Sequence, residues 1–370
     1  MKGSIKVATM FGIPVKVHWS FSLLILYILY IGYSSGLVWS SIACLVLFVL
    51  SLFFCVVLHE YGHALTARKY GVETRDIILS PIGGIARLER LPEKPIQEFY
   101  VAIAGPLVNI AIVIVIAPLF ILIFSNDIVW GEGFVRSWIP LMDPTRPINI
   151  LPFLLVGNVM LAGFNLLPAF PMDGGRVFRS LLSIKIGRLR ATQVASYLGN
   201  FFGIAMIAFG IYGGQIMTSL IGVFVFLLAT QEYRMVKMET ILKNNTVADI
   251  FRESFTKIYL DSKIAVAEDI IKRGLEKNFL VFDKEEKLAG ILHELFIMEA
   301  IKKKDLEGPV AEYLSHSYEA ISKTDNLDAV LKKMQEHSYS ILPVFEKEEL
   351  VGVLDVMMMN NFLRLKKKTG

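Results

Sequence analysis

The chain contains little cysteine and little charge. Among its 370 residues the only cysteines are Cys44 and Cys55, and both lie in apolar segments. This excludes a disulfide framework and a cysteine-based metal site. Charged residues make up 19% of the chain, whereas about 25% is usual for a soluble protein. The net charge of +4 is small, and we expect no nucleic-acid partner.

Hydrophobic residues are abundant and unevenly placed. They make up 54% of the chain, with a mean hydropathy of +0.54. Long apolar runs fill residues 18–230, whereas residues 231–370 have the composition of a water-soluble domain. Such a break indicates two parts. We predict a polytopic α-helical membrane domain over residues 1–230, a linker over 231–244, and a cytosolic α/β domain over 245–365.

Six apolar segments are candidates for membrane spans, each of which needs about 20 residues. They cover residues 18–34, 40–67, 99–124, 151–167, 191–212 and 215–229. The fourth is short, and the turn at Gly213-Gly214 between the last two is tight. No small-residue cleavage site follows the first segment, so we expect a retained span rather than a signal peptide.

Basic residues lie on one side of these spans. Lys2, Lys6 and Lys16 precede the first span, and further clusters follow the second, fourth and sixth. The remaining loops contain only Arg136 and Arg146. Because cytoplasmic loops are rich in lysine and arginine, we predict a multi-pass protein of the cell membrane with both termini in the cytoplasm.

A segment between the second and third spans has an extended pattern. Two short apolar runs between Ile77 and Leu88 surround Ser80-Pro81 and Gly83-Gly84, which is typical of a hairpin. One interpretation is a plain surface loop. The other is a strand at the membrane boundary that pairs with an extended peptide.

The sequence His59-Glu60-Tyr61-Gly62-His63 carries the strongest chemical signal. Residues four apart lie on one face of a helix, so both imidazoles can bind one zinc ion. Glu60 lies beside them and can accept a proton from water. The alternative is a pair of core histidines with ordinary partners. That alternative is weaker inside a membrane, where a buried glutamate is costly unless it has a function.

A catalytic zinc site needs a third protein ligand. His18 is the only other histidine in the membrane part, and beside Trp19 it is expected to be an interfacial residue. Asp173 is the better candidate. It follows two prolines, which stop the helix, and precedes two glycines, which permit close backbone approach. The predicted topology places it at the same membrane level as His59.

The soluble part contains an internal repeat. Leu280–Leu292 aligns without gaps with Leu342–Leu354, at an offset of 62 residues. Each copy reads as strand, charged turn and strand between two helical segments. This β-α-β-β-α order resembles a pair of CBS repeats over residues 245–365.

The membrane part resembles the site-2 protease family of intramembrane metalloproteases. The resemblance rests on the HExxH motif at residues 59–63 and the NxxPxxPxDG motif at residues 165–174. Gly105–Asn109 resembles the small-residue motif between these two, although close packing beside Gly105 explains Asn109 equally well. The C-terminal CBS pair is similar to that of one branch, which includes archaeal members and sporulation-factor proteases.

The resemblance implies a role for each motif residue. His59, His63 and Asp173 correspond to the zinc ligands, and Glu60 to the general base. Asn165 corresponds to the residue that hydrogen-bonds the scissile region or the oxyanion. A buried amide near a metal can donate to developing charge, and the alternative for Asn165 is an amide that packs between helices.

The CBS part departs from its family at two positions. Nucleotide-binding copies carry a ribose-binding aspartate after the second strand of the hairpin, where this chain has Phe296 and Met358. We therefore expect weak ATP binding or none. Homodimerisation, or docking of the cytosolic part of a substrate, is the expected role of the CBS pair.

The predicted function is that of an intramembrane zinc endopeptidase acting on membrane-embedded segments of other proteins. Its expected partners are a membrane-protein substrate and the lipid bilayer. A transporter or channel with a regulatory CBS tail is the main alternative, because polar residues in spans often mark an ion path. Transport does not require a glutamate beside the metal histidines. An enzyme acting on lipid would usually need more histidines than this membrane part contains.

Overall fold

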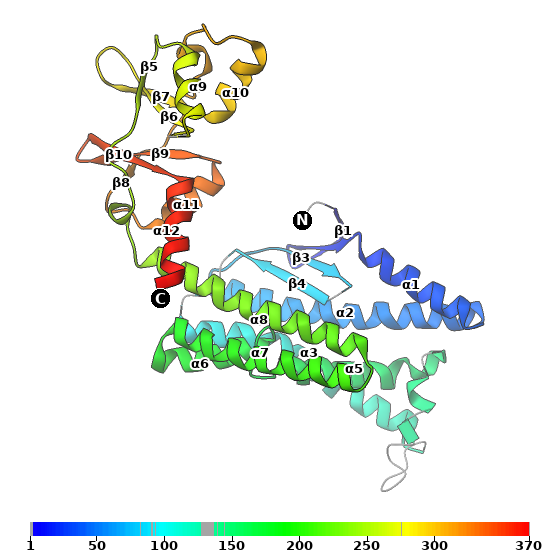
Figure 1. The fold of residues 1–370 in the computed structure, drawn as a ribbon. Helices are drawn as coiled ribbons and strands as arrows, with labels where there is room; N and C mark the ends of the chain where they lie inside the picture. Colours follow the sequence, from blue (N-terminus) through cyan, green and yellow to red (C-terminus); the bar gives the residue numbers. More distant parts are fainter. Residues whose placement is uncertain are drawn as a thin grey trace. The chain divides into compact units, whose positions relative to one another are not determined.

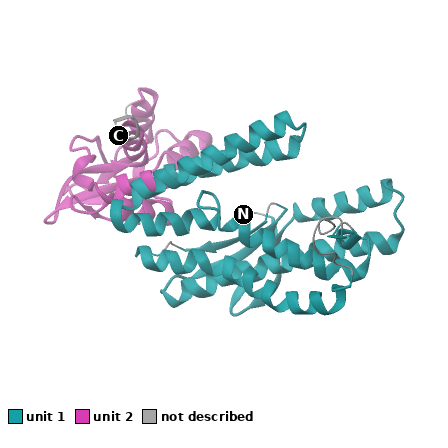
Figure 2. Ribbon diagram, turned by 90° about the horizontal axis from the view of Figure 1, so that it is seen from below, with its two compact units in different colours: residues 1–234 teal, residues 235–370 magenta. Residues whose placement is uncertain are grey.

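The computed structural model describes residues 3–81, 83–89, 92, 94–126, 137–138, 140–143, 145–274 and 276–369. Lys2 and Arg136 of the topology prediction, and Ile82 within the predicted hairpin, lie outside the described residues. The chain forms two compact units, residues 1–234 and residues 235–370 (Figure 2).

Helices make up most of the first unit (Figure 1). They are α1 (Phe21–Ser34), α2 (Trp39–Lys69), α3 (Pro95–Phe124), α5 (Ile150–Asn165), α6 (Asp173–Ile186), α7 (Arg188–Tyr212) and α8 (Ile216–Lys243). Within the described ranges, five helical segments are long and apolar enough to cross a membrane: α2, α3, Pro147–Asn165, α7 and α8. A multi-pass membrane protein is therefore confirmed, and the count of six spans stays a prediction.

The expected first span begins later than predicted. α1 has 14 residues and a length of about 21 Å. The hydrocarbon core of a bilayer is about 30 Å thick. The predicted start at about His18 is therefore three residues too early, because His18 ends β2 and residues 19–20 form a turn before the helix.

The last two helices of the first unit form a tight hairpin. Gly214 turns the chain with φ +65°, a conformation that glycine adopts without strain. A Cβ on Gly203 of α7 would lie 2.8 Å from the Gly222 carbonyl oxygen of α8. The two backbones therefore touch, as small residues allow in membrane helices. α8 then continues to Lys243, through most of the segment expected to be a linker.

A four-stranded sheet accompanies these helices. Its strands are β1 (Ser4–Met10), β2 (Ile13–His18), β3 (Thr74–Ser80) and β4 (Gly83–Leu88), in the order β1-β2-β3-β4. The hairpin expected between Ile77 and Leu88 is confirmed as β3 and β4. β1 and β2 were not predicted from the sequence, and β2 runs parallel to β3.

A buried carboxylate joins three of these strands. Asp76 of β3 is 1% exposed. Its Oδ2 accepts a hydrogen bond from Lys16 of β2 at 2.6 Å, and its Oδ1 accepts one from Arg87 of β4 at 2.6 Å. The bonds from Arg87 and then Lys16 lower the pKa of Asp76 to about 2, against the opposing effect of burial. Asp76 therefore stays ionised at neutral pH and holds the sheet together.

The second unit contains two copies of one supersecondary pattern. The first has β5 (Lys257–Tyr259), α9 (Ile264–Lys272), β6 (Phe279–Phe282), β7 (Leu288–Leu292) and α10 (Glu294–Lys303). The second has β8 (Ile321–Ser322), α11 (Leu327–Glu336), β9 (Ile341–Glu346), β10 (Glu349–Asp355) and α12 (Val356–Thr369). Each copy forms a three-stranded sheet, in the orders β5-β6-β7 and β8-β9-β10. The predicted β-α-β-β-α repeat is confirmed.

Candidate metal centre

Three side chains converge between α2 and the start of α6. The Nε2 atoms of His59 and His63 each lie 3.1 Å from Asp173 Oδ2, and 3.1 Å from one another. Both histidines are buried, and Asp173 is partly buried. This is the only group of potential metal ligands among the described residues. Residues separated by 110 positions in the sequence are thus brought to one point.

Glycines allow the start of α6 to reach this point. A Cβ on Gly174 would lie 2.3 Å from the carbonyl oxygen of Leu167, and a Cβ on Gly175 would lie 2.5 Å from the carbonyl carbon of Ala169. Neither position can carry a side chain without moving backbone. The close approach expected from the two glycines is therefore present, and it places Asp173 at the first position of α6.

The backbone of α3 covers the two imidazoles. A Cβ on Gly105 would lie 2.2 Å from His63 Nε2 and 2.7 Å from His59 Nε2. The small-residue motif at Gly105–Asn109 therefore has a direct physical role, because only a glycine leaves room for the histidines at this position.

The protonation of His63 is set by its backbone partner. His63 Nδ1 lies 2.7 Å from the Val101 carbonyl oxygen, which can only accept a hydrogen bond. Nδ1 therefore carries the proton in the neutral ring, and Nε2 presents a lone pair to the Asp173 carboxylate. His63 Nε2 and Asp173 Oδ2 are then both acceptors and lie 3.1 Å apart. Two acceptors at this distance require a positive charge between them. Ligands of tetrahedral zinc at its usual bond lengths are about 3.3 Å apart, so these residues fit zinc.

Glu60 lies between the histidine turn of α2 and strand β4. Its Oε2 accepts a hydrogen bond of 2.8 Å from the Ala86 amide. A Cβ on Gly84 would lie 2.9 Å from Glu60 Cγ, so β4 passes directly over this side chain. The predicted general base is thus beside the convergent ligands in sequence and is held by the edge strand of the sheet.

The remaining predicted residues lie outside the convergent group. Asn165 is the last residue of α5 and is half-buried. Its side chain makes no hydrogen bond to a described residue. His18 ends β2, where its Nδ1 lies 2.7 Å from Ser20 Oγ, and its ring packs near Trp19.

The structure adds a buried charge network that was not predicted from the sequence. Arg179 of α6 is fully buried. It donates to Glu98 of α3 through Nε at 2.7 Å and to Glu232 of α8 through Nη1 at 2.9 Å. Its guanidinium also lies 4.9 Å from the centre of the Phe170 ring, in the loop before Asp173. Charged residues in a membrane protein usually have such partners, and that expectation could have singled out these positions.

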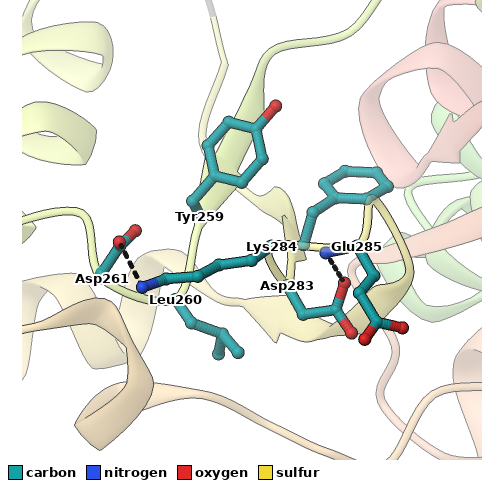
Figure 3. Close-up of a pocket in the computed structure, with 7 residues that line it drawn as sticks. Tyr259, Leu260, Asp261, Asp283, Lys284 and Glu285 are labelled. Atoms are coloured by element: carbon teal, nitrogen blue, oxygen red, sulfur yellow. Dashed lines mark hydrogen bonds and ion pairs between the residues drawn. The ribbon is translucent and has the colours of Figure 1, made fainter.

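A surface hollow in the second unit has a different character (Figure 3). It lies between the end of β5 and the turn after β6, and its lining includes Tyr259, Phe282 and the exposed ion pair of Lys284 with Asp261. An exposed pair of this kind contributes little free energy, and the hollow has no group of metal-ligating side chains.

Comparison with known proteins gives matches in both parts of the chain. The model of peptidase family M50 matches residues 47–210, and that of the CBS domain matches residues 310–357. A zinc metalloprotease of Methanocaldococcus jannaschii is 35% identical over 375 residues, covering 100% of this chain and 99% of that relative. Stage IV sporulation protein FB of Bacillus subtilis is 25% identical over 189 residues, covering 50% of this chain and 58% of that protein. A solved structure of a site-2 protease from M. jannaschii has 36% identity and a TM-score of 0.45, covering 62% of this chain and 95% of that chain.

Proposed function

Because the chain belongs to peptidase family M50, the site-2 proteases, and is a multi-pass membrane zinc metalloprotease, we propose that His59, His63 and Asp173 hold its zinc ion. The observation that carries this proposal is the convergence of three acceptor atoms 3.1 Å apart. The family and its relatives favour proteolysis over the transporter alternative.

The surrounding side chains have complementary tasks in peptide hydrolysis. Zinc, when bound, supplies Lewis acidity that activates water and polarises a peptide carbonyl. Glu60 takes the proton of the attacking water and passes it to the leaving amine. Asn165 donates a hydrogen bond to the developing oxyanion. Its half-buried amide, without a partner among the described residues, supports this role.

The substrate is a membrane-embedded segment of another protein. A helix hides its carbonyls in its own hydrogen bonds, so the segment must unwind before hydrolysis. β4 lies at one edge of the sheet and passes over Glu60. An extended peptide that adds to this edge would be held beside the general base.

Cleavage in lipid vesicles tests this function. The purified full chain should cut a single-span substrate within its span, because the ligands and Glu60 belong to the membrane unit. A zinc chelator should stop cleavage, and added zinc should restore it. Mass spectrometry of the products gives the cleavage position. A matched substrate with a polyleucine span, which unwinds less readily, should be cut more slowly. Metal flux without cleavage would instead support the transporter alternative.

The orientation is proposed from the placement of basic residues. Lys6 and Lys16 lie before α1, and Arg68 and Lys69 lie in the last turn of α2. In the cell membrane this pattern favours cytoplasmic termini, with the zinc ligands near the cytoplasmic side. Reporter fusions should give an outside signal at Gly36 and Gly213, and an inside signal at Gly187 and Lys243.

The second unit is proposed to self-associate and to dock the cytosolic part of a substrate. Leu295 and Met298 of α10 are exposed apolar residues, as are Val356 and Met357 of α12. Helix faces of this kind are suited to contact a second copy of the chain. Concentration-dependent crosslinking at α10, lost when Leu295 is changed to lysine, would support the homodimer.

Titration of the full chain with ATP tests nucleotide binding by the CBS pair. Phe296 and Met358 replace the ribose-binding aspartates, and the nearby Asp355 already accepts a hydrogen bond from the Met358 amide at 2.7 Å. Each ribose hydroxyl left unpaired would cost about 1–3 kcal/mol, which weakens binding roughly tenfold to a hundredfold. We expect no binding at micromolar ATP. A micromolar dissociation constant would revive an energy-sensing role.

A further inference from the structure

We propose that Asn158 of α5 is a positioning residue that sets the tautomer of His59 through Asn109 of α3. The inference rests on the proposed zinc site and extends it to a helix that supplies no ligand. Asn158 lies in the apolar helix α5, in neither of the two ligand motifs. It does not touch the convergent atoms, so its effect must pass through another side chain.

A chain of hydrogen bonds connects three helices at this place. His59 Nδ1 lies 2.5 Å from Asn109 Oδ1, and Asn109 Nδ2 donates to Asn158 Oδ1 at 2.9 Å. Asn158 Nδ2 donates to the backbone carbonyl of Leu154 at 2.8 Å. Asn109 and Asn158 are both 0% exposed. Water therefore cannot reach these hydrogen bonds and replace one of their partners.

The Leu154 carbonyl fixes the direction of the whole chain. A carbonyl oxygen can only accept, so the amide group that faces it must be the NH₂ of Asn158. The Asn158 oxygen then faces Asn109 and can only accept, which assigns the Asn109 NH₂ to that side. The remaining atom, Asn109 Oδ1, faces His59 and must accept as well. His59 Nδ1 therefore carries the proton.

Nε2 of His59 is therefore unprotonated, and its lone pair faces Asp173 and His63. His63 reaches the same state through a single bond to the Val101 carbonyl. The tautomers of the two histidines are thus fixed by different groups, that of His63 by a backbone oxygen and that of His59 by two side-chain amides. Partners on the second nitrogen of a ligating histidine typically change metal affinity 10–100-fold when removed.

An alternative role for Asn158 is helix packing alone, because asparagines also join helices in membranes. The two roles differ in what restores function. Packing requires a partner for each amide, whereas the tautomer requires only an acceptor opposite His59 Nδ1. A carboxylate at position 109 accepts in every rotamer, and it therefore needs no direction from Asn158.

The test is zinc retention against a competing chelator, measured on full-length protein. Asn158→Leu frees the Asn109 amide to rotate and present its NH₂ to His59, and zinc affinity should fall about 10–100-fold. Adding Asn109→Asp to Asn158→Leu should restore the affinity to within a few-fold of the parent. Met160→Leu, a substitution at an exposed position of the same helix, is the matched control and should change nothing. Asn158→Ala serves as a second variant if Asn158→Leu is not recovered in the membrane.

Each outcome decides between the inference and the site on which it rests. His59→Ala, measured in parallel, should lose zinc. If it retains zinc, the proposed ligand set is wrong. If it loses zinc while Asn158→Leu and Asn158→Ala bind zinc like the parent, only the inference is overturned. Failure of Asn109→Asp to rescue would assign Asn158 to packing.

Discussion

Replacing Glu60 with glutamine should reduce proteolysis about 10²–10⁴-fold, the usual contribution of a general base, while zinc content stays unchanged. Glutamine has the same shape and can still accept the Ala86 hydrogen bond through its amide oxygen. It cannot accept a proton at neutral pH. The substitution therefore leaves the three convergent atoms in place and removes only the proton acceptor.

Zinc analysis and a vesicle cleavage assay on the same preparation measure both effects. Because the variant should still bind its substrate, a pull-down followed by mass spectrometry would identify cellular substrates. Glu73→Gln, an acidic residue outside the motif, is the matched control and should cleave normally. Full activity in Glu60→Gln would remove Glu60 from the mechanism, and loss of zinc would make it a structural residue instead.

Replacing Asp173 with alanine should remove both zinc and activity. The substitution leaves two imidazoles, whereas a catalytic zinc site normally uses three protein ligands. It also removes the negative charge that lies 3.1 Å from both Nε2 atoms. We expect less than one tenth of the parental zinc after dialysis against a chelator, given losses of 10–100-fold even for outer partners of a ligand. Cleavage should be undetectable.

Asp143→Ala is the control for this experiment. Asp143 lies in the same unit, but its carboxylate pairs locally with Thr145 and Arg146. The control should keep its zinc and its activity. An Asp173→Ala protein with full zinc would show that the third ligand lies elsewhere.

Most of the secondary structure of the membrane unit can be predicted from local sequence. The first 20 residues are an exception. The long apolar runs of α2, α3 and α7 predict helices by themselves. β1 and β2 do not, because a strand depends on a partner, and β2 pairs with β3 some 60 residues away in the chain. The lysines of this segment carried a topology signal, and only the structure shows that Lys16 is also bonded to Asp76.

The residues of the candidate site likewise divide into those that local sequence predicts and those that depend on helix packing. His59 and His63 are predictable because their spacing places them on one face of one helix. Asp173 is predictable because the prolines and glycines beside it interrupt the helix. The Asn109–Asn158 pair is not, since it depends on how α3 packs against α5. The same holds for Arg179, whose partners lie on α3 and α8.

The bare backbone of Gly105 also has a genetic consequence. Every missense change of a glycine codon introduces a Cβ, and at this position that atom would lie 2.2 Å from His63 Nε2. No substitution of Gly105 therefore keeps the geometry of both imidazoles. In a selection for proteolysis, a saturation library should therefore lose every allele at codon 105 except glycine, alanine included, although this residue has no functional group.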